Sequence, residues 1–149
     1  MRTQIAALLL GFSLSSPQFA RGDQPLAGTL KTVKGGVTIG RGGKSLPGRE
    51  GLHIFSQDSI RTGADGSAGI ILHDGTRISL GPSSEIAIER FAFEPAQRQL
   101  SLVLRMVQGV AAYISGKISQ LAPGSVEVAT PAGIIGLRGT EFVLSVERP

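Results

Sequence analysis

The stretch that most resembles a nucleotide-binding element is glycine-rich and short, Gly40–Ser45. It ends in Gly-Lys-Ser, the part of a phosphate-binding loop that supplies a lysine and a hydroxyl group to a nucleotide. Such a loop also needs a glycine five positions before Gly43 and a helix behind it. Thr38 occupies that position, and Pro47 follows too soon for a helix. The stretch therefore predicts a hairpin loop rather than a phosphate site.

The sequence contains no combination of side chains that is typical of a catalytic nucleophile and its base. The chain has no cysteine and no Gly-x-Ser-x-Gly elbow, and its two histidines, His53 and His73, have no cysteine or obvious serine partner. His73 precedes an Asp-Gly turn, and His53 alternates with apolar neighbours. Both histidines are therefore predicted to lie at the surface, and we predict no enzyme activity.

Four acidic side chains remain as candidate calcium ligands or as an acid pair: Asp58, Asp65, Asp74 and Glu85. They are seven to eleven residues apart, whereas calcium loops place carboxylates two apart around a glycine. Each lies at a predicted turn, where a carboxylate accepts backbone hydrogen bonds. Turn chemistry accounts for these residues, and we predict no metal and no cofactor.

Charge and composition narrow the class of partner. The net charge is +4, but the 15 Lys and Arg residues are scattered, and aromatic residues make up only 5% of the chain. A nucleic-acid site needs a basic stripe interleaved with aromatic side chains, so we predict no nucleic-acid partner. The 149 residues, 41% of them hydrophobic, are enough to bury a core without disulfides.

The first residues have the pattern of a secretory signal peptide. Arg2 precedes an apolar run from Ile5 to Leu14, and small residues follow at Ala20 and Gly22. We predict a signal peptide over residues 1–22, cut after Ala20 or Gly22, and a β domain over residues 23–149. An N-terminal core helix is the alternative interpretation. The mature chain is expected to be periplasmic or secreted.

The elements that would position any site are strands. From Gly28 onward, apolar and polar residues alternate over five to eight positions between Gly, Pro and Asp-Gly turns. This pattern predicts an all-β fold, a compact antiparallel sandwich or a jelly-roll or β-roll-like domain, with no helix in the mature region. Leu100–Met106 and Phe142–Val146 are the predicted central strands.

Two local features refine this strand pattern. Asp65-Gly66 and Asp74-Gly75 bracket the apolar run Ala68–Leu72, and together they predict a three-strand meander from Ser59 to Leu80. The alternation through Ile86 and Ile88 changes phase before Phe91, which predicts a bulge near Glu89 and Arg90.

Two motifs in the β region carry a resemblance to a known family. The first runs over Ser59–Ala68 and Leu72–Glu85, and the second combines Thr130-Pro131-Ala132 with Gly136–Phe142. Together they resemble the signatures of FecR-type periplasmic domains, over about Gly28 to Glu147. The motif positions singled out as structural or interaction residues are Arg61, Thr62, Asp65, Gly66, Asp74, Gly75, Thr130, Pro131, Arg138, Gly139, Thr140 and Phe142.

The resemblance implies an exported all-β domain that serves recognition and signal transfer. In the namesake system, an inner-membrane regulator senses a loaded TonB-dependent receptor and passes the signal to an extracytoplasmic-function sigma factor. This sequence shows neither a sigma-binding segment nor a membrane span, so we expect a free-standing module without direct sigma-factor contact. Its partner is predicted to be a protein or an envelope component. The alternative is a self-assembling structural component of the envelope or extracellular matrix.

Two motif arginines suggest internal ion pairs. Arg61 and Arg138 each lie in a strand-turn signature, where a guanidinium can bond turn carbonyls or a buried carboxylate, and Asp65 and Glu141 are the candidate partners. Loss of such a pair would lower the melting temperature by several degrees. A solvated arginine at a strand end is the alternative.

Overall fold

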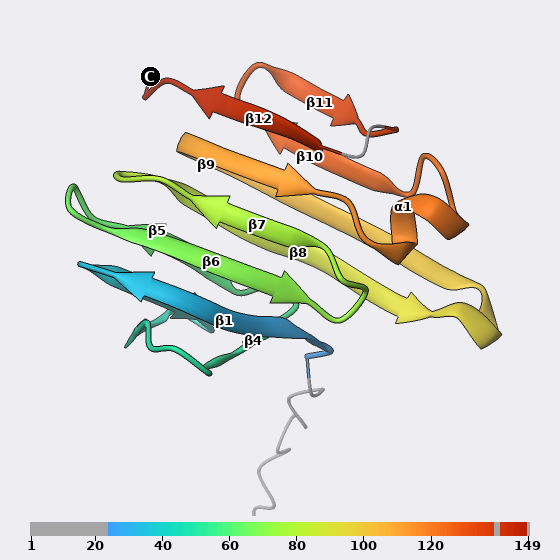
Figure 1. Cartoon of the computed structure of the whole chain (residues 1–149), viewed down its shortest axis with the longest axis horizontal. Helices are drawn as coiled ribbons and strands as arrows, with labels where there is room; N and C mark the ends of the chain where they lie inside the picture. Colours follow the sequence, from blue (N-terminus) through green and yellow to red (C-terminus); the bar gives the residue numbers. More distant parts are fainter. Residues whose placement is uncertain (1–23, 139–140, 149) are drawn as a thin grey trace, which may run out of the picture.

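A computed structural model describes residues 24–138 and 141–148 of the chain (Figure 1). The predicted signal peptide therefore lies outside the described residues, and its cleavage stays a prediction. The strands are β1 (Leu26–Lys34), β2 (Val37–Arg41), β3 (Lys44–Pro47), β4 (His53–Phe55), β5 (Ser59–Thr62), β6 (Ser67–Leu72), β7 (Arg77–Leu80), β8 (Glu85–Glu94), β9 (Gln99–Ile114), β10 (Val126–Thr130), β11 (Gly133–Gly136) and β12 (Glu141–Val146).

The strands form one strongly curled sheet whose two halves face each other as layers (Figure 1). The first layer has the order β4-β1-β6-β7-β9-β12, and the second has the order β3-β2-β5-β8-β9-β10-β11. The long strand β9 belongs to both, since its first part pairs with β8 and its last part pairs with β7. The predicted all-β sandwich or β-roll is confirmed.

Strand β9 changes layers at Gly109, which has a φ of 93°. A Cβ there would collide with the backbone and side chain of Ser84, so this position needs a glycine. The Ser84 hydroxyl accepts a hydrogen bond from Val110 N (2.9 Å), and Thr62 Oγ1 accepts one from Ser84 N (2.9 Å). These buried hydrogen bonds fix the place where the sheet folds over.

Alternating apolar side chains from both layers fill the space between them, as period-two burial requires. The largest fully buried ones are Leu30, Ile39, Ile54, Ile60, Ile70, Leu72, Ile78, Ile88, Leu102, Leu104, Met106 and Ile118. The predicted bulge is confirmed: the pairing of β8 with β9 shifts register between Ile88 and Arg90, which leaves Arg90 exposed and Phe91 buried.

The predicted meander from Ser59 to Leu80 is wrong in one connection. Strands β6 and β7 form the expected hairpin around Asp74-Gly75, with Gly75 at a φ of 87°. Strand β5, however, pairs with β2 and β8, so Asp65-Gly66 links the two layers instead of closing a hairpin. The Asp-Gly pair correctly indicates a turn at this position, but it does not determine which strand lies next to β5.

Three further expectations need correction. Strand β12 lies at the rim of its layer and is not central. The pairing of β10 with β9 is parallel, while the other pairings of the described strands are antiparallel. A parallel pair needs a crossover, and a short helix that the sequence pattern did not predict, α1 (Lys117–Leu121), lies in that connection. In residues 24–138 and 141–148, no helix is long and apolar enough to cross a membrane.

Candidate interaction site

Each layer has an edge strand on each of two opposite sides of the molecule. On one of these sides, which we call the sealed side, side-chain hydrogen bonds join the two layers. On this sealed side, where β3 and β4 are the last strands, Arg41 donates hydrogen bonds to Asp58 Oδ2 (2.7 Å) and to the carbonyl of His53 (2.8 Å). The Asp58 carboxylate, 2% exposed, also accepts Phe55 N. The hydrogen bond to Asp58 raises the pKa of the Arg41 guanidinium, against the effect of burial. Strands β2 and β4 are thereby tied together.

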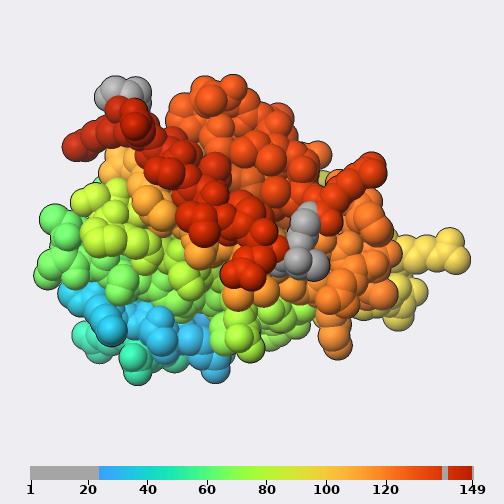
Figure 2. Space-filling view, turned by 45° about the horizontal axis from the view of Figure 1, so that its top comes forward, coloured from blue at the N-terminus to red at the C-terminus, as the bar shows by residue number. Residues whose placement is uncertain are grey.

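The other side, where β11 and β12 are the last strands, is open. Among the described residues, β11 pairs only with β10, and β12 pairs only with β9. Ile135 lies opposite Val128 and therefore shares its inward face, yet it is 40% exposed. Figure 2 shows this C-terminal part of the chain gathered on one side, away from β1. We call the space between β11 and β12, with the two unpaired strand edges, the open edge.

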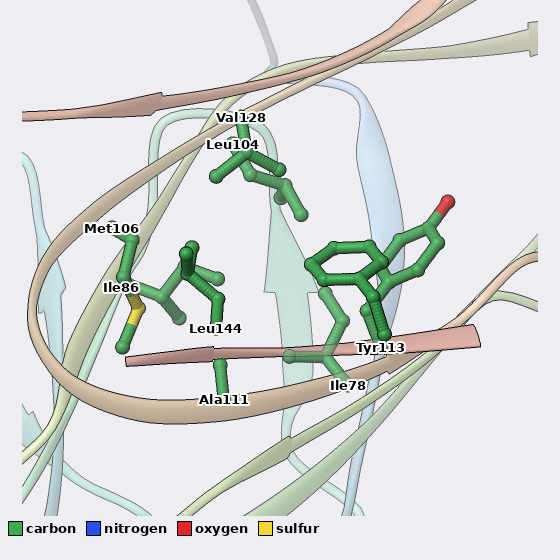
Figure 3. A pocket seen from close by; sticks show the side chains of 9 residues that line it. Ile78, Ile86, Leu104, Met106, Ala111, Tyr113, Val128 and Leu144 are labelled. Carbon is green, nitrogen blue, oxygen red and sulfur yellow. The ribbon is translucent and has the colours of Figure 1, made fainter. Parts of the chain in front are cut away.

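An apolar hollow lies inside the open edge (Figure 3). Its cavity volume is about 10 Å³, about enough for one water molecule, and its lining side chains come from both layers. These lining residues are Ile78, Ile86, Leu104, Met106, Ala111, Tyr113, Val128, Phe142 and Leu144. The lining is apolar apart from the Tyr113 hydroxyl, and the cavity is too small to hold a side chain of a partner.

Tyr113 is the one lining residue with a polar atom, and it stacks on Phe142 with ring centroids 4.8 Å apart. Its hydroxyl is buried and has no hydrogen-bond partner among the described residues. Burial raises the pKa of Tyr113, and the charge of Asp74 acts in the same direction, while the Thr76 hydroxyl opposes it. The Thr76 hydroxyl donates its proton to Asp74 Oδ2 (2.8 Å) and so cannot donate it to the Tyr113 oxygen.

The first sequence motif supplies structural contacts. Thr62 joins the buried hydrogen bonds at the fold of β9. The Asp74 carboxylate, buried at 1% exposure, accepts Thr76 N (3.0 Å) and Ile118 N (3.2 Å), which anchors α1 to the β6–β7 hairpin. Asp65 accepts Gly36 N (3.4 Å) at the link between the layers. A Cβ on Gly66 would collide with the carbonyl of Gly36.

The predicted arginine partners differ from the observed ones. Arg61 pairs with Glu85 (3.0 Å) on the surface of the second layer, so its proposed pairing with Asp65 is wrong. Arg138 is exposed, and among the described residues it forms no ion pair with Glu141. Turn residues can reach several strands, so sequence distance alone did not identify these partners.

The second motif surrounds the open edge. Thr130 Oγ1 donates to the carbonyl of Gly133 (3.0 Å) and thereby shapes the turn through Pro131 into β11. Arg138 lies on the segment that leads to β12, and Phe142 enters the hollow. Two further motif positions, Gly139 and Thr140, lie outside the described residues.

Sequence reasoning missed most of the residues that make the open edge. Ile134 and Ile135 stand between two glycines in β11 and are 72% and 40% exposed. The adjacent isoleucines in a four-residue exposed strand were the available signal. Tyr113 and Leu144 gave no such signal, because the alternation of apolar and polar residues is the same in a strand beside an opening as in a strand of a closed core.

The fold and the open edge define a small all-β domain with exposed strand edges, a class that can accept a further strand. A family model described as FecR protein matches residues 58–149, more than half of the chain, and the chain therefore belongs to the FecR family. FecR domains are non-catalytic signalling domains, associated with signal transfer in sigma/anti-sigma systems. No curated protein and no solved structure matched the chain.

The match confirms the family that the two motifs indicated. It begins at Asp58, so strands β1 to β4, which the sequence resemblance included from Gly28 onward, lie outside it. The open edge lies wholly within the matched region.

Proposed function

We propose that this chain is an exported, non-catalytic interaction module that binds a protein or envelope component at the open edge. Among the described strands, the observation that carries this proposal is the unpaired outer edge of β11, whose inward-facing Ile135 is 40% exposed, together with the unpaired outer edge of β12. An extended segment of a partner can pair with such an edge and cover the exposed face of Ile135. Binding of this kind suits envelope sensing or signal transfer, which the family membership supports.

Site-specific crosslinking tests the binding site. A photo-crosslinking residue replaces Ile135 at the open edge, and the matched control carries it at Leu26, which is 38% exposed compared with 40% for Ile135. In the native host we expect one discrete adduct from position 135 and none from position 26. Equal adducts from both positions, or none from either, would contradict the proposal.

A second pair of variants links that adduct to the edge itself. Ile135→Lys places a charge on the inward face of β11, and Leu26→Lys is the matched control. With a crosslinker kept at Ile134 of β11, the adduct should disappear in Ile135→Lys and persist in Leu26→Lys. Circular dichroism of both variants confirms that each remains folded.

Export is the second part of the proposal, supported by the charged start and the apolar run Ile5–Leu14. Cell fractionation should place the chain in the periplasm or the medium, with an N-terminus at Arg21 or Asp23. A chain that keeps Met1 and stays in the cytoplasm would overturn this part.

A self-assembling structural component is the alternative function, because unpaired strand edges can also pair between copies. In that case the crosslinked adduct from Ile135 would be a ladder of multiples of this chain. A single adduct with a different protein excludes it.

A further inference from the structure

A second surface of the molecule has an arrangement that the open edge does not use. On the outer face of the first layer, Val110 and Ile114 of β9 are 43% and 44% exposed, and Val143 of β12 is 70% exposed. Ala112 lies between the two β9 residues and directly opposite Val143. We call these four residues the outer patch. They face away from the core, because Ala111 and Tyr113, which alternate with them, are buried.

Two opposite charges flank the outer patch. The pairing register places Arg77 of β7 and Glu141 of β12 directly opposite Ile114, one on each side. Directly opposite residues in antiparallel strands share a face, so all three point outward. Two strand spacings, about 10 Å, separate Arg77 from Glu141, which is too far for an ion pair within one chain. Among the described residues, neither forms an ion pair.

The outer face of the second layer is arranged differently. There, Arg61 pairs with Glu85, and Arg105 pairs with Glu89, each across neighbouring strands. Two charge pairs on that face are matched within the chain, although Glu127 of β10, exposed on the same face, forms no ion pair among the described residues. On the first layer, an apolar row separates Arg77 from Glu141, so each is available to an opposite charge on another molecule.

We propose that the outer patch binds a second copy of this chain, with the two-fold axis parallel to β9. This axis turns the two outer faces toward each other and exchanges the β7 side with the β12 side. Ile114 then packs on the partner's Ile114, and Arg77 lies against the partner's Glu141. The symmetry repeats the ion pair on the other side, so one patch is complementary to itself.

The charges also select this axis over its main alternative. A two-fold axis across the strands would exchange the two ends of β9 and place Arg77 away from the partner's Glu141. Only the axis along β9 forms both ion pairs at once. Because the patch covers three strands and few residues, its area falls below the roughly 800 Å² per partner of a standard interface. The dimer is therefore weak and forms at high concentration.

Charge reversal tests this dimer. Sedimentation velocity of the purified chain, from micromolar to millimolar concentration, should show a monomer–dimer equilibrium that stops at two copies. Arg77→Glu or Glu141→Arg alone should raise the dissociation constant about tenfold or more, because each creates two like-charge contacts. The double variant should restore it to within about threefold.

Lys31→Glu, which reverses an exposed charge on β1 of the same layer, is the matched control and should leave the dissociation constant unchanged. A chain that remains monomeric at all concentrations, or single reversals with no effect, would overturn the proposal, as would a double variant as weak as the singles. The open edge is tested separately, since Ile135→Lys should abolish partner binding and leave the dimer intact.

Discussion

On the sealed side of the molecule, polar groups tie the two layers together, whereas on the open side the layers end with apolar side chains around a hollow. Arg41 reaches from β2 to the carbonyl of His53 on β4, and the buried Asp58 carboxylate holds it there. Strands β11 and β12 have no such tie among the described residues. Ile135 is left partly exposed although its register places it toward the core.

This contrast suggests that the two sides of the sheet have different roles: contacts on the sealed side stabilise the fold, and the open side binds a partner. In the described part of the chain, the sealed side also ends in strands with one unpaired edge, β3 and β4, but the Arg41 hydrogen bonds join its two layers. The open side combines its unpaired edges with the exposed inward face of Ile135, and a natural protein retains such an apolar edge at the risk of aggregation. Its presence within the family match therefore points to a use, and the predictions below test each side in turn.

The largest effect is expected at the sealed side. Asp58→Ala removes the buried acceptor of Arg41 and Phe55 N, and we expect the free energy of unfolding to fall by about 3 kcal/mol. Arg41 can turn toward water, which keeps the loss at the lower end of the range for a broken buried pair. Urea denaturation measures it, with Asp58→Asn as the conservative control. A loss below about 1 kcal/mol would mean that hydrophobic packing alone seals this side.

A smaller effect of opposite sign is expected at the hollow of the open side. Tyr113→Phe removes a buried hydroxyl that has no hydrogen-bond partner, so the free energy of unfolding should rise by about 1 kcal/mol at neutral pH. The stacking on Phe142 is retained because the ring remains.

The raised pKa of Tyr113 gives this variant a pH signature. Folding favours the neutral phenol, so the stability of the wild-type chain is full below about pH 10 and falls as the pH rises from there through the raised folded-state pKa. Tyr113 is the sole tyrosine, so an ultraviolet absorbance titration reports it alone. The advantage of Tyr113→Phe should widen above about pH 10. A constant advantage across that range would contradict the burial of the hydroxyl.

The smallest effect is expected on the surface of the open side. Arg138 is exposed, and Arg138→Ala should change the free energy of unfolding by less than about 0.5 kcal/mol. The sequence alone suggested a loss of several degrees in melting temperature. Differential scanning calorimetry decides between the two expectations, and a drop of several degrees would restore a buried pairing for this residue.

Much of the fold was predictable from local patterns. The alternation of apolar residues located the strands, the Asp74-Gly75 pair located a hairpin, and the phase change near Glu89 located the bulge. The candidate site was predictable only in outline. The second motif indicated the correct segment through Thr130, Arg138 and Phe142. Nothing in the motif indicated that, among the described strands, β12 pairs with β9 alone and has no strand on its other side.

The sequence by itself determined where most strands lie and which of their side chains face inward, because these follow from the period of a pleated strand and from turn residues a few positions apart. Three features were decided by the tertiary structure alone. Strand β5 pairs with β8 and not with β6, β9 crosses between the layers at Gly109, and Arg41 forms an ion pair with Asp58. These choices depend on contacts between residues distant in sequence, where the burial gained is shared among many strands. The open edge also depends on the tertiary structure, because only the arrangement of all described strands shows that β11 and β12 have no neighbour on their outer edges.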